Sequence, residues 1–401
     1  MRGRWAARTV AFLGVAVFAI AIGTRAESPS APPASSRALV GSADGTLPIG
    51  LTTATSGDHS RSATVSFSGD VLLHTRVWRT AAANASASDD DGYDFQPMFE
   101  PIEPLVAGAD WSVCHMEVNL DAENQNLASF PIFRGPGAVA VDLSAVGFDV
   151  CSTASNHSLD GRTAATFETI DVLEAAGIRA VGTARSAEEA TTNVWFDIEG
   201  IRFAHLSYAY WFNGFLLPDD QPWAANQIDE QRILDDATAA RNAGADFVML
   251  SMHWGNEYRH TPSDQQAELG PRLLASEDID LIIGHHAHVV QPIEQINGEW
   301  LVHGVGNLLS NFSELPRRDQ LLVTATVVEQ PDGTFAADHL EVVPVFLDID
   351  TLSIWPSGPG IRPTDVSASL ATDLEASWQR VNDVLDDGSG WRRFEMVGAT
   401  P

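Results

Sequence analysis

Five apolar, strand-like runs in this chain each end in side chains that can bind a metal ion. The runs cover residues 64–70, 110–117, 148–157, 246–253 and 280–288. Functional sites in α/β folds gather beyond the carboxyl ends of strands, so the five endings can converge on one pocket. The pattern predicts a metal-assisted catalytic site.

The strongest of these motifs is Gly-His-His-Ala-His at residues 284–288. On an extended segment, His286 and His288 point the same way and can share a metal ion. His285 can support them or take the place of His286. Three of the chain's 12 histidines fall within four residues, and this concentration favours metal binding.

The other endings offer carboxylate, amide and imidazole groups. Asp70 follows a strand and a glycine, although a turn aspartate that caps a helix is a competing explanation. His115 and Glu117 alternate on one strand face, so Glu117 could bind or bridge metal ions. The amide oxygen of Asn156 suits a hard metal, and the adjacent His157 could donate a proton to a leaving group.

The spacing of apolar residues predicts the elements that position these groups. Helices are expected at residues 163–176, 229–243 and 265–275, and they alternate with strands in an α/β pattern. After Trp300 the pattern changes to successive strands, at 300–303, 320–329 and 339–347. We expect these to form a second sheet packed on the first, giving a β-sandwich flanked by helices.

The N-terminal segment has the pattern of a signal peptide. Residues 1–8 are basic, 9–23 are apolar and 24–26 include small residues, so we expect 1–26 to direct export, with an uncleaved membrane anchor as the alternative. Residues 27–60 have the composition of a disordered linker. One large domain is expected over 61–350, followed by a C-terminal extension, 351–401, that contains a helix. The protein is therefore predicted to be extracellular or associated with the cell envelope.

Charge restricts the classes of partner. The formal net charge is -31, and all 23 basic residues are arginines. Nucleic-acid binding is excluded because phosphate contacts require clustered positive charge. A polyanionic substrate would be repelled unless metal ions or local arginines compensate. The plainest explanation of the charge is a solvated acidic surface.

The chain has two cysteines, Cys114 and Cys151. If their strands are neighbours in a parallel sheet, the two sulfurs come within reach of a disulfide, which an exported protein permits. Two buried free thiols are an equal alternative.

Taken in order, these motifs resemble the CapA family, which is associated with poly-γ-glutamate capsule synthesis and is related to the calcineurin-like metallophosphoesterases. The resemblance covers roughly residues 63–312. It rests on Phe-Ser-Gly-Asp70, His-Met-Glu117 where the family usually has Asn-Leu-Glu, Ser-Asn-His157 through Asp160, Gly182, Met-His-Trp-Gly-Asn-Glu-Tyr258, Gly-His-His-Ala-His-Val-Val-Gln291 and Gly-Val-Gly-Asn307. It implies an α/β fold, the four-layer αββα sandwich of the metallophosphoesterases.

The resemblance also implies a ligand set for one or two divalent ions. The metal ligands would be Asp70, Glu117, Asn156, His253, His286 and His288, with His157 as the catalytic acid. Dimetal phosphoesterases usually begin with Asp-x-His, which is absent here, so His74 or His115 is a candidate replacement. Mixed carboxylate, amide and imidazole ligands suit Mn, Fe or Zn. Candidate supporting residues are His74, His115, Asp160, Glu257, His285 and Asn307.

Two functions follow from this reading. The first is an exported, metal-dependent hydrolase of phosphoester or amide bonds that acts on an anionic polymer in capsule biosynthesis. The alternative is a non-catalytic polymer-binding or structural component of a membrane capsule-synthesis complex. His157 distinguishes them, because hydrolysis of a poor leaving group needs a proton donor. Aromatic residues in segments 81–96 and 208–226 could line a polymer groove or serve as ordinary packing.

Overall fold

The computed structural model describes residues 60–86, 91–192, 195–358, 366–385 and 392–393. The predicted signal segment, 1–26, lies outside the described residues, as does the predicted linker apart from its last residue. Within the described ranges, no helix combines the length and the apolar character needed to cross a membrane.

The first sheet contains nine strands among the described residues, and its centre is parallel. Strand β1 pairs in parallel with β2, β2 with β5 and β5 with β6, whereas β14, β15 and β16 extend the other side of β1 antiparallel. The strands are β1 (Ser62–Val71), β2 (Trp111–Met116), β5 (Val150–Ser152), β6 (Arg179–Val181), β13 (Asn307–Leu309), β14 (Asp319–Glu329), β15 (Phe335–Leu347), β16 (Ile354–Pro356) and β17 (Arg392–Arg393).

The second sheet contains six strands among the described residues, in the order β11-β12-β10-β9-β8-β7. Its four central strands are parallel, and β7 and β11 are antiparallel edges. The strands are β7 (Trp195–Ile198), β8 (Ile201–Ala209), β9 (Phe247–His253), β10 (Leu281–His285), β11 (Ile293–Ile296) and β12 (Glu299–Val302). A separate pair is formed by β3 (Asn119–Asp121) and β4 (Arg134–Pro136).

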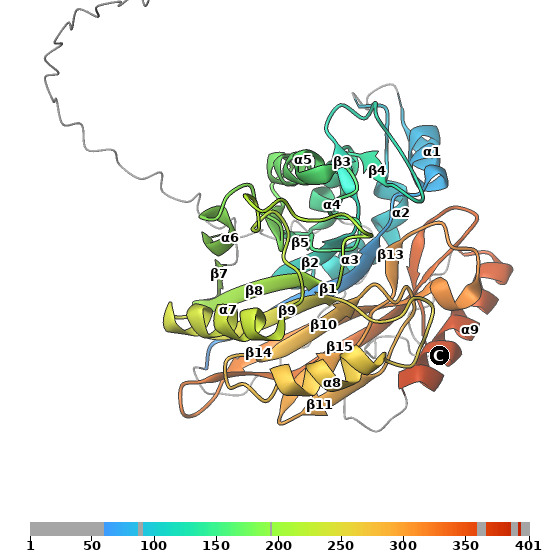
Figure 1. Cartoon of the computed structure of the whole chain (residues 1–401). Coiled ribbons are helices and arrows are strands. Elements are labelled where there is room, and N and C mark those ends of the chain that lie inside the picture. Colours follow the sequence, from blue (N-terminus) through green and yellow to red (C-terminus); the bar gives the residue numbers. More distant parts are fainter. Residues whose placement is uncertain (1–59, 87–90, 193–194, 359–365, 386–391, 394–401) are drawn as a thin grey trace, which may run out of the picture. The chain divides into compact units, whose positions relative to one another are not determined.

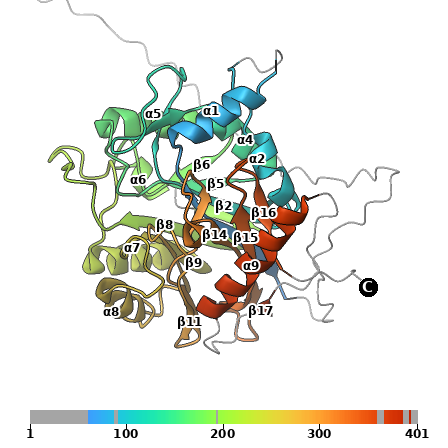
Figure 2. The same cartoon turned by 90° about the vertical axis from the view of Figure 1, so that its right-hand side faces the viewer.

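Helices cover the outer faces of both sheets, which gives the predicted four-layer αββα sandwich (Figures 1 and 2). The predicted helices at 163–176, 229–243 and 265–275 are α5 (Arg162–Ala175), α7 (Glu230–Asn242) and α8 (Asp264–Leu273). The helices α1 to α5 lie on the first sheet, and α7 and α8 lie on the second. The other helices are α1 (Thr75–Asn84), α2 (Gln96–Phe99), α3 (Glu103–Val106), α4 (Val139–Val146), α6 (Glu189–Thr192) and α9 (Ala368–Leu385).

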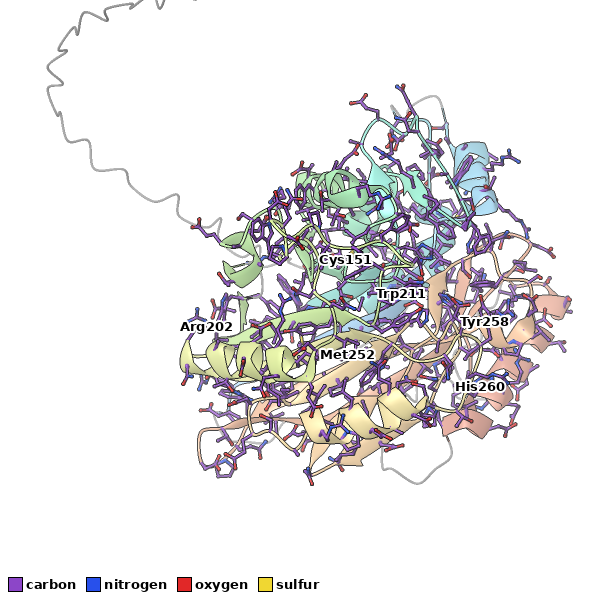
Figure 3. All side chains as sticks on the ribbon, viewed as in Figure 1. Cys151, Arg202, Trp211, Met252, Tyr258 and His260 are labelled. Atoms are coloured by element: carbon purple, nitrogen blue, oxygen red, sulfur yellow. A yellow bond between two sulfur atoms is a disulfide. The ribbon has the colours of Figure 1, made fainter. Side chains whose placement is uncertain are left out.

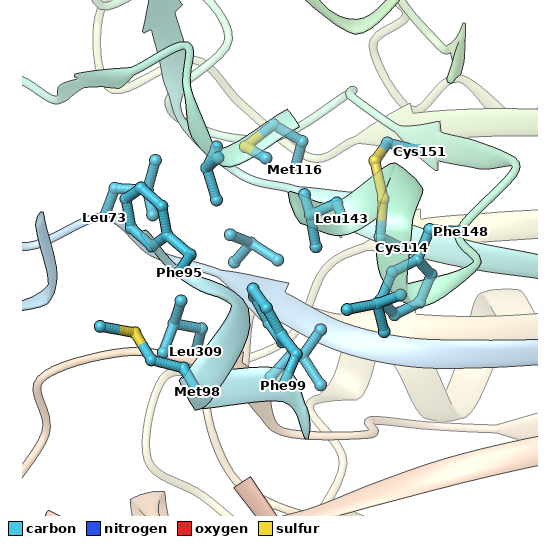
Figure 4. Close-up of a cluster of buried hydrophobic side chains, with 14 of the residues drawn as sticks. Leu73, Phe95, Met98, Phe99, Cys114, Met116, Leu143, Phe148, Cys151 and Leu309 are labelled. Atoms are coloured by element: carbon cyan, nitrogen blue, oxygen red, sulfur yellow. A yellow bond between two sulfur atoms is a disulfide. The ribbon is translucent and has the colours of Figure 1, made fainter. Parts of the chain in front are cut away.

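Strand residues alternate between two apolar cores, as the period of two in a strand requires. In β9, Phe247 and Met249 face the core between the sheets, whereas Val248 and Leu250 face α7 and α8. Both faces of the central strands are therefore buried, which explains their continuous apolar sequences. A further apolar core lies between the first sheet and helices α1 to α5, and Figure 4 shows part of it, including Phe95 and Phe99.

The strands after Trp300 are placed differently from our expectation. They do not form a sheet of their own. Strand β12 pairs with β10 in the second sheet, whereas β14 pairs antiparallel with β1 in the first sheet. Helix α9, from the predicted extension, packs against β14 and β15. Alternating apolar residues indicate which faces of a strand are buried, but they do not identify its neighbours.

A disulfide joins Cys114 of β2 to Cys151 of β5. The two residues are directly paired in the parallel ladder, and both are fully buried. The sequence left free thiols as an equal alternative because it did not establish that β2 and β5 are neighbours. The structure decides for the disulfide (Figure 4).

Replacing both cysteines with alanine should lower the free energy of unfolding by about 3 kcal/mol, because the crosslink spans 37 positions and restricts the unfolded chain. Urea unfolding of the oxidised wild type and of Cys114→Ala/Cys151→Ala measures this loss. Under reducing conditions the difference should shrink. Equal stability of the two oxidised proteins would contradict the prediction.

Candidate metal centre

The carboxyl ends of strands from both sheets meet at one place, as the sequence predicted. In the strand register, Asp70 is opposite both His115 and Asn307, and His253 is opposite His285. Contacts between side chains join the two sheets there, since His115 of the first sheet touches His253 of the second.

Two glycines permit the close approach of backbone that places these groups. A methyl group at Gly69 would lie 2.2 Å from the carbonyl oxygen of Gly306. One at Gly284 would lie 1.9 Å from the carbonyl oxygen of His303. Any side chain at either position would push the strands apart. At Gly69 it would also displace Asp70, which is the next residue.

Two groups of candidate ligand atoms share Glu117. One group contains Glu117, His253 and His286, and the other contains Glu117, Asp70 and His288; within each, the atoms lie within 4.8 Å of one another. Oε1 of Glu117 lies 4.0 Å from Nε2 of His253 and 3.9 Å from Nε2 of His288. A carboxylate shared by two such groups is suited to bridging two metal ions.

Buried polar atoms in these groups lack hydrogen-bond partners. They include both carboxylate oxygens of Glu117, Oδ1 of Asp70 and Nδ1 of His286. All three residues are at most 2% exposed. Burial of unpaired polar atoms is costly, and a divalent cation would satisfy these atoms together. The residues present therefore fit a metal ion.

Asp70 lies between two imidazoles. Its Oδ1 is 3.4 Å from Nδ1 of His285, and its Oδ2 is 3.1 Å from Nδ1 of His288. The backbone N–H of His286 also donates to Oδ2, at 3.2 Å. Burial by itself would raise the pKa of the Asp70 carboxyl, but its interactions with the nearby imidazoles of His285 and His288 outweigh it and hold that pKa well below its usual value. The lowered pKa favours the ionised form of Asp70, which is the form that can bind a metal ion.

Burial acts differently on the other members of the two groups. It raises the pKa of Glu117 well above its usual value, and repulsion by Asp70 adds to the shift. Burial also lowers the pKa of His253 well below its usual value and that of His286 to about 3, so both rings are neutral. Neutral imidazoles keep a lone pair for a metal ion, and a bound cation would favour the ionised form of Glu117.

His115 lies one layer behind these groups. Its Nδ1 is 2.7 Å from Oγ of Ser152, and its Nε2 is 2.9 Å from Nδ1 of His253. The ring also stacks on His285, with centroids 4.1 Å apart and planes 12° apart. His115, His285 and Asp70 form a further group of candidate ligand atoms. However, stacked rings do not aim their in-plane lone pairs at a common point, and both nitrogens of His115 have partners.

His74, the other candidate for the absent imidazole, does not join any ligand group found among the described residues. Its Nδ1 is 3.3 Å from the carbonyl oxygen of Leu72, and its ring packs edge-on against Phe133 and Phe312. Burial lowers its pKa to about 4. The group around Asp70 and His288 therefore gains no imidazole from His74.

His157 lies beside the ligand groups and is oriented by a carboxylate. Its Nδ1 is 2.7 Å from Oδ2 of Asp160, and its ring packs edge-on against Phe133, 4.7 Å between centroids. Because the carboxylate accepts the Nδ1 proton, Nε2 is left to exchange a proton with a substrate.

Three further predicted residues also lie at the centre. Oδ1 of Asn156 is 3.0 Å from Nε2 of His253, and Oδ1 of Asn307 is 2.8 Å from Nδ1 of His288. Glu257 is exposed and forms a candidate ligand group with His286 and His288.

Sequence reasoning missed Asn213. Its Nδ2 lies 3.3 Å from Nδ1 of His157, and its Oδ1 accepts from Nδ2 of Asn156, at 3.4 Å. It sits on a loop in a left-handed conformation, with φ of 51°. The segment 208–226 was singled out only for its aromatic residues, and no motif marked this asparagine.

The aromatic residues of the two loops divide between packing and the site. Phe95 and Phe212 are buried in apolar clusters. Tyr210 packs against the ring of His286, with centroids 4.7 Å apart. Trp211 and Tyr258, both labelled in Figure 3, are 47% and 40% exposed.

Two arginines lie over aromatic rings next to the centre. The guanidinium of Arg317 is 3.6 Å from the centroid of Tyr258, whose ring stacks with His288. The guanidinium of Arg162 is 4.3 Å from the centroid of Phe215. These guanidinium groups bring positive charge near the site in a strongly acidic chain, although Arg317 is also paired with Glu314, 3.3 Å away.

Comparison with known proteins identifies the family. Residues 64–312 match the family model described as "Bacterial capsule synthesis protein PGA_cap". The chain belongs to this family. The match confirms the predicted CapA relationship.

Two relatives of this PGA_cap chain are named for capsule or PGA biosynthesis. It is 25% identical over 319 residues to the PGA biosynthesis protein CapA of Bacillus subtilis, covering 78% of this chain and 79% of the relative. It is 26% identical over 303 residues to the capsule biosynthesis protein CapA of Bacillus anthracis, covering 73% and 72%.

Solved structures align more distantly with the PGA_cap chain. A calcineurin-like phosphoesterase from Bacillus subtilis is 11% identical with a TM-score of 0.42, covering 81% of this chain and 98% of that one. The NAD nucleotidase of Haemophilus influenzae is 12% identical with a TM-score of 0.45, covering 84% and 65%. Similarity at this level carries no statement about activity.

The centre's buried histidines make stability depend on pH, and His205 offers a test outside the ligand groups. It lies between the sheets, with Nε2 2.9 Å from Oγ of Ser251, and burial lowers its pKa to about 3. An unfolded histidine has a pKa near 6.5. As the pH falls below that value, the unfolded chain takes up a proton that the folded protein does not, so stability decreases.

Between pH 7.5 and 5.5, chelator-treated wild type should lose about 1.4 kcal/mol more stability than His205→Phe, which lacks this group. Urea unfolding at the two pH values measures both losses. The remaining histidines act equally in the two proteins. An equal loss in both would show that His205 titrates normally in the folded protein.

Proposed function

We propose that this chain is a metal-dependent hydrolase that acts on an anionic polymer or phosphoester in capsule biosynthesis. One observation carries the proposal: Glu117, with both oxygens buried and unpaired, is shared by two groups of candidate ligands beside the His157–Asp160 pair. Membership of a capsule-synthesis family supports the biological setting.

The proposed ligands divide between two ions. Asn156, His253 and His286 would hold one ion together with Glu117, and Asp70 and His288 would hold the second, also with Glu117. The second group has fewer ligands because the chain lacks the Asp-x-His motif, so its ion should bind more weakly. The ligand types suit Mn, Fe or Zn.

Bound metal would polarise the bond to be cleaved and lower the pKa of water. The protein's own contribution is positioning and proton transfer. His157, held through Nδ1 by Asp160 at 2.7 Å, would donate a proton from Nε2 to the leaving group. Asn213 accepts a hydrogen bond from Asn156 and its Nδ2 lies 3.3 Å from Nδ1 of His157, so it packs between the acid and a proposed ligand.

An anionic substrate must overcome the net charge of -31. Arg317 and Arg162 would supply local positive charge, and their stacking on Tyr258 and Phe215 restricts the side chains before a substrate binds. The names of the relatives refer to PGA, capsule and, for a Mycobacterium tuberculosis protein, polyglutamine synthesis. We therefore propose a polycarboxylate as the polymer.

The absence of the Asp-x-His imidazole favours a second candidate function. A centre with one weak metal site could bind polymer without cleaving it, as a component of a membrane capsule-synthesis complex. The two functions differ in turnover and agree in metal and polymer binding.

We also propose that the protein is exported and works at the cell envelope. The Cys114–Cys151 disulfide supports this, because structural disulfides persist in oxidising compartments.

His157→Ala should retain its metal and lower kcat by roughly 10²- to 10⁴-fold, because it removes the proton donor and leaves the proposed ligands in place. Metal content by mass spectrometry is measured on protein purified without chelators, together with turnover of γ-glutamyl oligomers and of an alkyl phosphodiester, whose leaving groups are poor and need a proton. His286→Ala/His288→Ala should lose both metal and activity.

The outcomes separate the two candidate functions. Wild type that holds metal and binds polymer but turns over neither substrate class would establish the binding function. Undiminished turnover by His157→Ala would remove this residue from the mechanism.

Export predicts that the native protein is found in the envelope or medium fraction with no free thiol. Cell fractionation and thiol labelling with a maleimide, before and after reduction, test this. Recovery in the cytoplasm with two reactive thiols would contradict the proposed location.

A further inference from the structure

A buried chain of hydrogen bonds runs from the first sheet to the proposed metal ligands. Ser152 Oγ lies 2.7 Å from Nδ1 of His115, and Nε2 of His115 lies 2.9 Å from Nδ1 of His253. Nε2 of His253 then lies 3.0 Å from Oδ1 of Asn156. All four residues are at most 3% exposed, so the chain is shielded from water.

Neutral imidazoles give such a chain a direction, because each ring has one nitrogen that donates and one that accepts. Nε2 of His115 and Nδ1 of His253 face each other at 2.9 Å, so one of them must carry a proton and the other a lone pair. The two protons can therefore be arranged in two ways that satisfy the contact between the rings, and these differ at the contact between Nε2 of His253 and Oδ1 of Asn156.

In the first arrangement, called outward because every donor points toward Asn156, Ser152 donates to His115 and His115 donates to His253. Nε2–H of His253 then donates to Asn156. Nε2 of His253 and Oδ1 of Asn156, the two proposed ligand atoms, are then joined to each other by a hydrogen bond. This arrangement is closed to a metal ion.

In the inward direction, Nδ1–H of His253 donates to Nε2 of His115, and Nδ1–H of His115 donates to Ser152. The hydroxyl of Ser152 can then donate a hydrogen bond to the carbonyl oxygen of Cys114, 3.4 Å away. Nε2 of His253 and Oδ1 of Asn156 then both present lone pairs. Each ring stays neutral in both directions, so the pair carries the same number of protons throughout.

We propose that His115 is a positioning residue that accepts the Nδ1 proton of His253 and so holds His253 in the tautomer that binds metal through Nε2. The inference rests on the proposed function only in requiring a metal ion at the centre. It also accounts for His115 without making it a ligand.

The first test is the affinity of the chelator-treated full chain for Mn²⁺, measured by titration calorimetry. His115→Phe keeps a ring to stack on His285 but loses both nitrogens, and it should weaken binding about 10- to 100-fold. Ser152→Ala removes only the last acceptor and should weaken binding less. His205→Phe is the matched control, a buried histidine hydrogen-bonded to Ser251, and it should bind Mn²⁺ as the wild type does.

The second test observes the tautomer directly. In wild type loaded with Zn²⁺, ¹⁵N NMR should show His253 protonated at Nδ1 and metal-bound at Nε2. In Zn²⁺-loaded Ser152→Ala, which changes one small side chain, the signal of the Nδ1 proton should weaken or exchange faster. This measurement decides the question if His115→Phe does not fold.

Undiminished Mn²⁺ affinity in His115→Phe, or Zn²⁺ bound through Nδ1 of His253, would overturn the inference. Metal binding without turnover would instead defeat the hydrolase and leave the positioning role intact. A wild type that binds no metal would overturn both.

Discussion

The cost of burying Glu117 and Asp70 is the constraint on which the centre depends. Both oxygens of Glu117 and Oδ1 of Asp70 are buried without hydrogen-bond partners at the junction of the two sheets. Such groups destabilise a fold unless a positive charge or a proton compensates them. Imidazoles partly compensate Asp70, whereas Glu117 lies 3.9 to 4.0 Å from its nearest imidazole nitrogens and keeps a raised pKa. A divalent cation offers the missing compensation.

The two sheets meet that constraint jointly. The first sheet supplies the carboxylates and the pair His157 and Asp160, and the second supplies His253, His285 at the end of β10, and His286 and His288 just after it. Close approach at Gly69 and Gly284 and the apolar core between the sheets hold the halves in register. A substitution that changes how the two sheets pack would therefore alter the geometry of the ligands even though every ligand residue is unchanged.

Behind the ligands lies a layer of imidazole and hydroxyl groups, in which Ser152 contacts His115, His115 contacts His253, and His285 stacks on His115. This layer gives buried ring nitrogens partners that can either donate or accept. Centres of this kind require ligands held in one tautomer as well as one rotamer.

The sequence by itself determined the α/β class, three of the helices, the strands that end in polar groups and most of the residues that gather at the centre. These depend on local periodicity and residue type, which are written in the chain. Tertiary structure decided what depends on partners distant in sequence. It paired β14 with β1, joined Cys114 to Cys151, brought Asn213 to His157 and engaged both nitrogens of His115. Periodicity specifies a buried face but not the neighbour that covers it, so these contacts could not be read from the sequence.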